Sequence, residues 1–128
     1  MDTPDLQPAL ERVQEYFAAF LSGDSEAYAA QWTYPACFFS QGRWLALSDA
    51  AACQASNDRY LAEARAGGMV SGRIQELSAR PEGPRAAWVD GRFSREDAVG
   101  RTFGETRASY LVVQTAEGWR VAVCVVKD

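Results

Sequence analysis

Residues 85–115 have the sequence RAAWVDGRFSREDAVGRTFGETRASYLVVQT, and this stretch decides the fold. It contains two runs with the pattern of long strands, 85–96 and 101–115, separated by Asp97-Ala98-Val99-Gly100. Asp in the first position and Gly in the fourth are typical of a type I turn. The stretch therefore predicts two antiparallel strands joined by a tight turn, and the other elements can be placed around this hairpin.

The charges on the two strands predict how they pair. If Asp97 faces Gly100 across the turn, opposite charges meet at three positions. These pairs are Glu96 with Arg101, Arg92 with Glu105, and Asp90 with Arg107. Each pair of this kind favours its register by a few tenths of a kcal/mol. We therefore predict this register for the hairpin.

Turn signals divide the rest of the second half of the chain. Pro81-Glu82-Gly83-Pro84 and Glu117-Gly118 are turn sequences, and they predict further strands at 69–80 and 118–127. Together with the hairpin, these strands make a four-stranded antiparallel meander.

The first half of the chain predicts helices. Between Pro4 and Ser22, apolar residues recur at spacings of three and four, which is the pattern of an amphipathic helix. Gly23 can end this helix in a left-handed conformation, and Asp24 can cap a short second helix over 25–32.

The segment after the second helix predicts two short strands and a third helix. The strands are expected at 37–39 and 43–46, and Ser48 is the expected N-cap of a helix over roughly 49–66. Helices followed by a meander indicate the α+β class, with the helices laid on one face of a curved sheet.

Composition limits the size and the partners of the protein. Its 128 residues fit a single domain over 1–128. The net charge is −4 and the pI about 4.8, whereas nucleic acids and anionic membranes require a basic surface. The first residues, MDTPDLQ, lack the layout of a signal peptide, so a cytoplasmic location is expected.

The chain contains no histidine, which argues against His-based triads, His-ligated metals and the usual neutral-pH base. Its cysteines, Cys37, Cys53 and Cys124, are scattered and favour buried thiols over a disulfide or a zinc site. No metal and no organic cofactor is therefore expected. Of the 13 basic residues, all but Lys127 are arginine, which we interpret as the signature of a GC-rich bacterial genome.

The order of these elements resembles the nuclear transport factor 2-like superfamily, in particular its SnoaL-like and ketosteroid isomerase-like branch. Local similarity comes from Gly23-Asp24-Ser25-Glu26-Ala27, from Trp32 to Ser40, and from Gly118-Trp119-Arg120-Val121. The resemblance implies a cone-shaped α+β barrel, with three N-terminal helices packed on a curved, mainly antiparallel sheet. It also implies a pocket between helices and sheet, and frequent homodimerisation through the outer sheet face.

The isomerase site of that branch carries over only in part. Its oxyanion-binding tyrosine is matched by Tyr16, whereas Ser40 stands where the carboxylate base belongs and Leu111 where a protonated carboxylic acid belongs. Serine cannot replace aspartate as a base near neutral pH without a further activating group. Isomerase chemistry of that type is therefore not expected.

Asp90 is the carboxylate of most interest, because it lies in mid-strand, where aspartate is disfavoured. If it faces a cavity, desolvation raises its pKa toward that of a general base, and Arg107 opposite lowers it. The alternative is a solvent-facing ladder of ion pairs with Arg92, Glu105 and Arg107.

The sequence leaves open which face of the hairpin points inward. Hydrophobicity places one set of residues inward, namely Ala87, Val89, Phe93, Tyr110 and Val112. The pattern of the related family places another set inward, namely Trp88, Asp90, Ser109 and Leu111.

The leading hypothesis is a pocket for a small, largely apolar molecule with a polar group. Its wall is expected to include Tyr16, Phe20, Trp32, Ser40, Tyr60, Trp88, Asp90 and Cys124, with Arg107 as a candidate for an anionic group. In an enzyme, Asp90 would be the base and Tyr16 the hydrogen-bond donor for proton transfer, isomerisation or hydration of a carbonyl-bearing substrate. The alternative is a non-catalytic dimerisation module whose pocket is filled with side chains.

Overall fold

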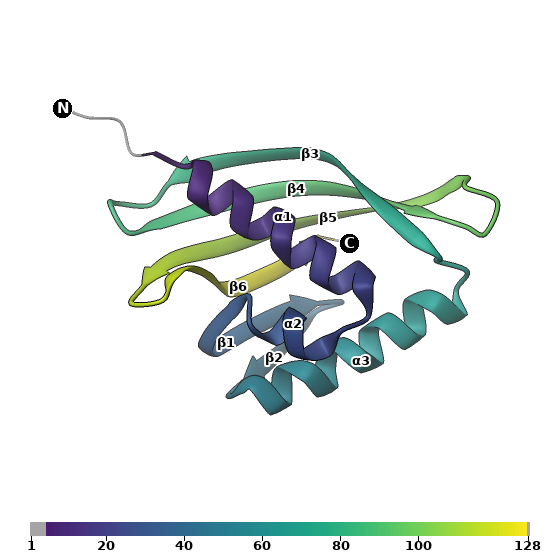
Figure 1. Cartoon of the computed structure of the whole chain (residues 1–128), viewed down its shortest axis with the longest axis horizontal. Helices are drawn as coiled ribbons and strands as arrows, with labels where there is room; N and C mark the ends of the chain where they lie inside the picture. The colour runs from purple at the N-terminus through teal and green to yellow at the C-terminus, as the bar shows by residue number, and fades with distance from the viewer. Residues whose placement is uncertain (1–4, 128) are drawn as a thin grey trace.

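The computed structural model of the chain describes residues 5–127 (Figure 1). The helices are α1 (Gln7–Ser22), α2 (Ser25–Ala29) and α3 (Ala50–Ala66). The strands are β1 (Trp32–Ser40), β2 (Arg43–Leu47), β3 (Ser71–Pro81), β4 (Ala86–Glu96), β5 (Thr102–Thr115) and β6 (Gly118–Lys127). This is the predicted order of elements, with two strands before the third helix and a four-stranded meander after it.

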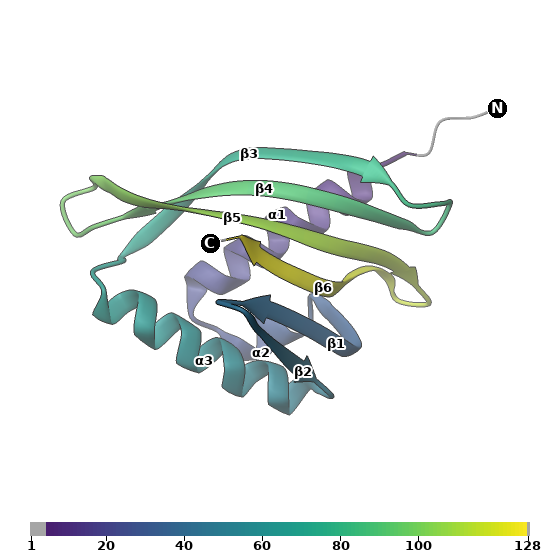
Figure 2. The ribbon, with the colours of Figure 1, turned by 180° about the vertical axis from the view of Figure 1, so that it is seen from behind.

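The strands form one sheet in the order β2-β1-β6-β5-β4-β3. Neighbouring strands are antiparallel except for β1 and β6, which run parallel. Figure 1 shows α1 crossing one face of the curved sheet, which we call the inner face, with α2 and α3 at its lower side. Seen from behind in Figure 2, the outer face carries no described helix. The predicted α+β architecture is confirmed.

Helix α1 forms where the apolar spacing predicts it. Its buried residues, Ala9, Val13, Tyr16 and Ala19, recur at three and four and share one face. Gly23 ends the helix with φ 77°, and its N–H donates to the Phe20 carbonyl at 3.3 Å. Both features follow from the sequence, because the left-handed conformation is one that glycine adopts at little cost.

Helix α2 is shorter than predicted, and β1 is longer. The Asp24 carboxylate caps α2 as expected, accepting the Ala27 N–H at 3.1 Å, but the helix ends at Ala29. The Gln31 carbonyl already accepts the Val121 N–H at 2.9 Å, and Trp32 pairs with Val121 in the sheet. Pairing with a strand 90 residues away, which local sequence does not report, thus ends the helix early.

The N-cap of α3 is Asp49, and the prediction of Ser48 is wrong. The Asp49 carboxylate accepts the Ala52 N–H at 2.9 Å, while its backbone is extended. Asp and Ser are almost equally good caps, so residue type alone does not choose between neighbours.

The turn of the central hairpin forms as predicted, but the register does not. The Gly100 N–H donates to the Asp97 carbonyl at 3.0 Å, and Gly100 has φ 81°. A type I turn followed by a left-handed glycine closes a three-residue hairpin loop, so Asp97 pairs with Arg101 rather than with Gly100.

A bulge between Arg95 and Glu96, opposite Thr102 to Gly104, shifts the register once more. As a result, Asp90 pairs with Ser109 and Arg92 lies opposite Arg107. Of the three predicted charge pairs, only Arg92 with Glu105 forms, as a diagonal ion pair at 2.6 Å. The total shift is two residues, and a shift of two leaves every side chain on its own face.

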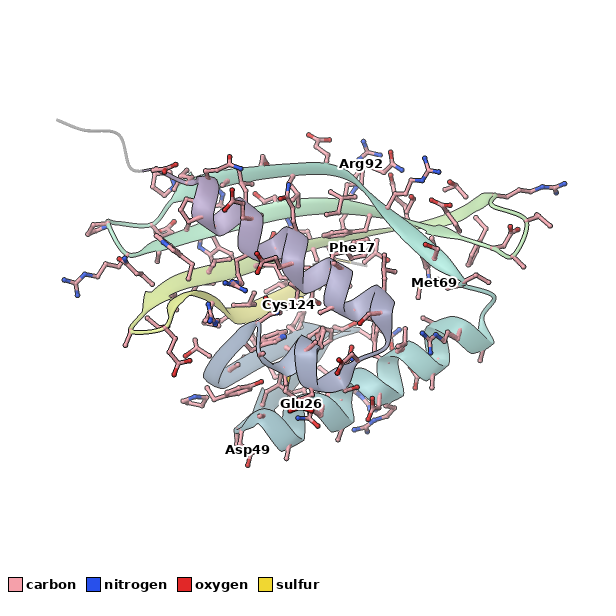
Figure 3. All side chains as sticks on the ribbon, in the orientation of Figure 1. Phe17, Glu26, Asp49, Met69, Arg92 and Cys124 are labelled. Carbon is pink, nitrogen blue, oxygen red and sulfur yellow. The ribbon has the colours of Figure 1, made fainter. Side chains whose placement is uncertain are left out.

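Hydrophobicity predicted the inner face of the hairpin correctly. Ala87, Val89, Phe93, Tyr110 and Val112 are all buried against the helices and belong to one core cluster. The family pattern, which placed Trp88, Asp90, Ser109 and Leu111 inward, is wrong for this chain, because strand alternation sends these side chains to the outer face. The inner face therefore meets α1 through Phe93 of β4 and Phe17 of α1, whose ring centroids lie 4.8 Å apart. Phe17 is labelled in Figure 3.

Candidate functional site

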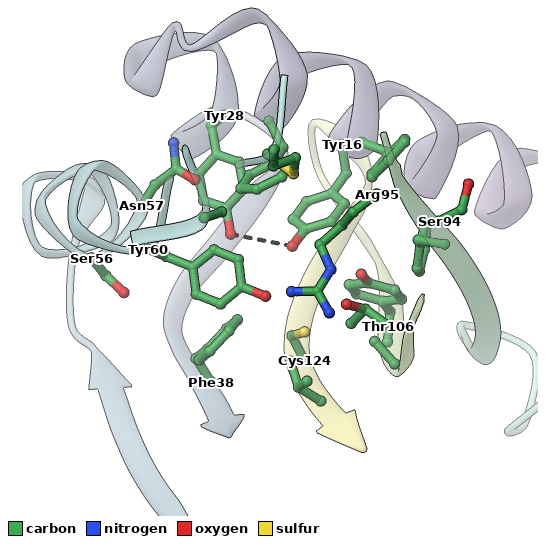
Figure 4. Close-up of a pocket in the computed structure, with 18 residues that line it drawn as sticks. Tyr16, Tyr28, Phe38, Ser56, Asn57, Tyr60, Ser94, Arg95, Thr106 and Cys124 are labelled. Atoms are coloured by element: carbon green, nitrogen blue, oxygen red, sulfur yellow. Dashed lines mark hydrogen bonds between the residues drawn. The ribbon is translucent and has the colours of Figure 1, made fainter. Parts of the chain in front are cut away.

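A cavity of about 70 Å³ lies between the helices and the inner face of the sheet (Figure 4). Its apolar wall comes from all three helices and from β1, β4, β5 and β6. The main aromatic members are Tyr16, Phe20, Tyr28, Phe38, Phe93 and Tyr110. The polar groups that line it are on α3, β4 and β5, and they are Ser56, Asn57, Tyr60, Ser94, Arg95 and Thr106.

A cluster of tyrosines surrounds Tyr16 in the cavity wall. The Tyr16 ring lies 5.0 Å from the Tyr110 ring and 5.1 Å from the Tyr28 ring, and its hydroxyl accepts the Tyr28 hydroxyl at 3.3 Å. Burial raises the pKa of all three phenols well above 10. These hydroxyls therefore stay protonated and can donate hydrogen bonds, but they do not act as bases.

Cys124, a residue of β6, lies in the same wall (Figure 3). Burial raises the pKa of its thiol far above 9. The thiol is thus uncharged and unreactive near neutral pH, which agrees with the expectation of a buried small hydrophobe.

Arg95 is the charged residue of the cavity. It is near the end of β4, and Figure 4 shows its guanidinium directed into the space beside Tyr60, Thr106 and Cys124. The side chain crosses Gly104, where an added Cβ would lie 2.7 Å from the Arg95 Nη2 atom. Its Nε–H is buried and has no hydrogen-bond partner.

Helix α3 supplies the polar groups on the opposite side. Asn57 is 3% exposed, and its amide N–H donates to the Ser25 hydroxyl at 3.4 Å, while its Oδ1 atom has no partner. Tyr60 is more exposed, and its ring contacts those of Phe20 at 5.7 Å and Phe38 at 6.0 Å.

Phe38, Ser56 and Tyr60 also line a second depression on the other side of this ring contact. It has a volume of about 390 Å³ and lies between α3 and the β1–β2 hairpin. Ser40, a predicted pocket residue, lines this outer groove and not the cavity. The cavity and this wider groove thus have Phe38, Ser56 and Tyr60 in common.

The predicted site residues fall into two sets. Tyr16, Phe20, Tyr60 and Cys124 are brought together around the cavity. Trp32 touches Tyr16 edge-on at 6.0 Å but lines a different depression, where it lies beside Tyr34 and Arg120.

Trp88, Asp90 and Arg107 are on the outer face, away from the cavity. Asp90 accepts a hydrogen bond from Ser109 and lies 3.5 Å from Arg80 Nε and 3.7 Å from Lys127 Nζ. The Ser109 hydrogen bond holds the pKa of the Asp90 carboxyl below 3.8, and Lys127 and Arg80 add to the effect. Of the two environments predicted for Asp90, the solvent-facing ion-pair ladder is the one it has. Its partners are Arg80, Lys127 and Ser109.

The cavity has no carboxylate that could take the role of general base predicted for Asp90, because no Asp or Glu is among the described residues that line it. Within residues 5–127, no three His, Cys, Asp or Glu side chains gather closely enough to hold a metal ion. The same part of the chain has no helix that is both long and apolar enough to cross a bilayer. The chemistry that the cavity offers is therefore hydrogen bonding and one positive charge.

Sequence similarity to a known family covers almost the whole chain. Residues 8–128 match the family model described as "NTF2-like protein (DUF6841)". The chain belongs to this NTF2-like family. No curated protein sequence matches it significantly.

Solved structures share the fold of this NTF2-like protein at low sequence identity. An NTF2-like protein with a cystatin-like fold from Novosphingobium aromaticivorans has TM-score 0.75 and 19% identity, over 95% of this chain and 80% of that one. A putative ketosteroid isomerase from Shewanella frigidimarina has TM-score 0.72 and 13% identity, over 94% and 95%. A dehydratase of the NTF2-like family from Streptomyces avermitilis, also named as putative, has TM-score 0.73 and 14% identity, over 95% and 94%.

Sequence reasoning missed several of the cavity residues as members of the site, among them Arg95, Asn57 and Tyr110. Hydrophobicity had placed Tyr110 inward, and a signal was also present for the other two. Arg95 follows Phe93 by two and so shares its face of the strand, and Asn57 lies four residues from both Cys53 and Leu61 on α3. Arg95 was overlooked because an arginine next to a turn is usually a solvated residue.

Proposed function

We propose that this NTF2-like protein binds a small organic molecule in the cavity between α1, α3 and the sheet. The observation that carries the proposal is an aromatic-walled cavity into which polar groups converge, two of them with buried unpaired atoms, Asn57 Oδ1 and Arg95 Nε. Buried polar atoms normally have partners, and an apolar pocket with a few converging polar groups is typical of ligand sites.

Within this proposal Tyr16 keeps its predicted role as a hydrogen-bond donor. Its raised pKa keeps the hydroxyl protonated, and Figure 4 shows it directed toward the centre of the cavity. Two structural neighbours carry the names of enzymes that act on small molecules, an isomerase and a dehydratase. With no carboxylate among the described lining residues, we propose binding, and not proton abstraction by Asp90, as the function of this cavity.

The test is thermal denaturation of the purified protein against small carbonyl-bearing compounds. A ligand of the native state raises the melting temperature, because each tenfold excess over Kd adds about 1.4 kcal/mol. Ala64→Phe, which places a ring in the cavity wall, should abolish the shift, and Ala62→Phe on the exposed side of the same helix should retain it. No shift with any compound would overturn the proposal.

A second candidate is a non-catalytic dimerisation module with a filled pocket. The cavity volume favours it, because about 70 Å³ is small beside the roughly 300–1,000 Å³ of typical ligand pockets. In this case no compound would shift the melting temperature of the wild type, of Ala64→Phe or of Ala62→Phe.

We also propose that the protein is a homodimer that pairs through the outer face of the sheet. Inner-face Phe38 and Cys124 pair across β1 and β6, so alternation places their neighbours on the outer face. The apolar side chains there are Cys37, Phe39, Trp44, Leu111, Val123 and Val125. The bacterial origin and the cytoplasmic location expected from the sequence stay predictions.

A further inference from the structure

The charge of Arg95 lacks a partner within the structure. Among residues 5–127, no carboxylate lies within 4.0 Å of its guanidinium. The guanidinium lies over the face of the Phe103 ring, with its carbon 5.8 Å from the ring centroid. A buried and unpaired guanidinium N–H costs free energy, which an incoming acceptor would recover.

Gly104 makes room for Arg95 on the neighbouring strand. Its lack of a side chain lets the guanidinium lie directly against β5, since a Cβ at 104 would come within 2.7 Å of the Nη2 atom and displace the guanidinium. Phe103, whose ring lies against the Arg95 guanidinium, is 45% exposed. The guanidinium is thus supported from β5 and directed toward the cavity, as Figure 4 shows.

The cavity around this cation contains no negative charge. Of the described residues that line it, Arg95 alone is charged, and the groups nearest to its guanidinium in Figure 4 are uncharged hydroxyls and a thiol. Burial keeps Tyr16, Tyr28 and Tyr110 protonated, so none of them supplies an anion. The local charge is therefore positive, although the whole protein carries a net charge of −4.

We propose that the ligand of this cavity is a small organic carboxylate, which the Arg95 guanidinium binds. The planar fork of arginine matches the two oxygens of a carboxylate, and Figure 4 shows the guanidinium directed into the cavity. The apolar part of the ligand lies among the aromatic rings, with Tyr16 as a further donor. This assignment rests on the proposed ligand-binding function and adds the chemical class of the ligand.

Size and charge argue for a monocarboxylate with few carbon atoms. A cavity of about 150 Å³ holds benzene, and this one measures about 70 Å³. A single arginine without a second cation balances one negative charge, whereas a phosphate ester carries up to two. Larger acids need more room than this cavity offers, and the outer groove that shares Phe38 and Tyr60 with it lies beside it.

The test uses matched acids and amides on the purified full-length protein. The pairs are propionate with propionamide, butyrate with butyramide, and benzoate with benzamide, measured at pH 7 by melting temperature and by titration calorimetry. We expect at least one acid to bind at least tenfold more tightly than its amide. Amides that bind as well as the acids, or better, would overturn the carboxylate assignment and leave the proposed ligand-binding function intact.

Arg95→Met should lower the affinity for the acid at least tenfold and leave the weak affinity for the amide unchanged. The matched control is Arg101→Met, which removes the same charge from an exposed position in the adjacent turn. Arg95→Lys keeps the positive charge but lacks the planar guanidinium, so it should recover only part of the affinity for the acid. An acid affinity that is equal in wild type and folded Arg95→Met would overturn the proposal, and no binding of either member of any pair would overturn both proposals.

Discussion

At the scale of single residues, environment and not identity decides what each polar group does. Asp90 and Arg95 are five positions apart on β4, but one belongs to the outer face and the other to the cavity. Asp90 has a hydroxyl and two cations around it, whereas Arg95 has an unpaired N–H. Asp90, which looked catalytic from its sequence position, thus already has ion-pair partners. Arg95, which sequence reasoning overlooked, has no carboxylate partner among the described residues.

The lowered pKa of Asp90 predicts a pH-dependent contribution to stability. Its folded-state pKa lies below the ordinary value of about 3.9, so the contribution is present above that pH and is lost as pH falls through the folded pKa. The side chain is 35% exposed, and solvent screening keeps the effect small. Urea unfolding should show wild type more stable than Asp90→Asn at pH 5 and 7, with the gap closing near pH 3.

Ser109→Ala checks the cause of this shift. It removes the largest contribution, so the Asp90 pKa measured by NMR should rise toward its ordinary value. A stability gap that is the same at all three pH values, or a pKa unmoved by Ser109→Ala, would contradict this account.

At the scale of elements, the ends are decided by individual hydrogen bonds. The sequence located α3 within one residue, but two adjacent residues could cap it, and the structure assigns the cap to Asp49. Similarly, the Asp97–Gly100 turn was foreseen, while its left-handed glycine and the following bulge moved the register by two residues.

The cap assignment predicts a difference between two neighbouring substitutions. Asp49→Ala leaves the Ala52 N–H without its acceptor and should lower the free energy of unfolding by about 1 kcal/mol. Ser48→Ala changes an exposed side chain that does not cap α3 and should stay within about 0.5 kcal/mol of wild type. Urea denaturation of the two variants measures both, and equal losses would show that the cap is shared.

At the scale of the whole molecule, the curved sheet has two faces with different surroundings. The inner face is covered by helices, and the outer face exposes a mixture of apolar and charged side chains. The proposed homodimer covers that outer face. A two-fold interface is formed by the same surface of both subunits, so each substitution in it acts twice.

Val125→Arg tests the dimer directly. The substitution would bury an unpaired charge from each subunit at the interface, so sedimentation velocity should show monomers where wild type sediments as a dimer. Val70→Arg is the control, because Val70 is 65% exposed and lies before β3, outside the proposed interface. A wild-type protein that is monomeric at tens of micromolar, or a Val125→Arg variant that stays dimeric, would contradict the proposal.

The sequence by itself determined the element order and the α+β class, and its hydrophobic alternation supplied the correct one of the two faces that it left open for the hairpin. These follow from local periodicity and turn chemistry, which each segment carries in its own residues, as with Val13 and Tyr16 in α1 or Val89 and Phe93 in β4. Tyr16, Phe20, Tyr60 and Cys124 were also placed at the cavity before the structure.

Only the tertiary structure decided the strand register, the early end of α2 and the contents of the cavity. Each depends on groups far apart in the chain, as when Val121 draws Gln31 into the sheet or Gly104 makes room for Arg95. A residue's partners across the sheet are set by packing and by bulges, which local pattern does not encode. The charge of the candidate site therefore became visible only once β4, β5 and α3 were brought together.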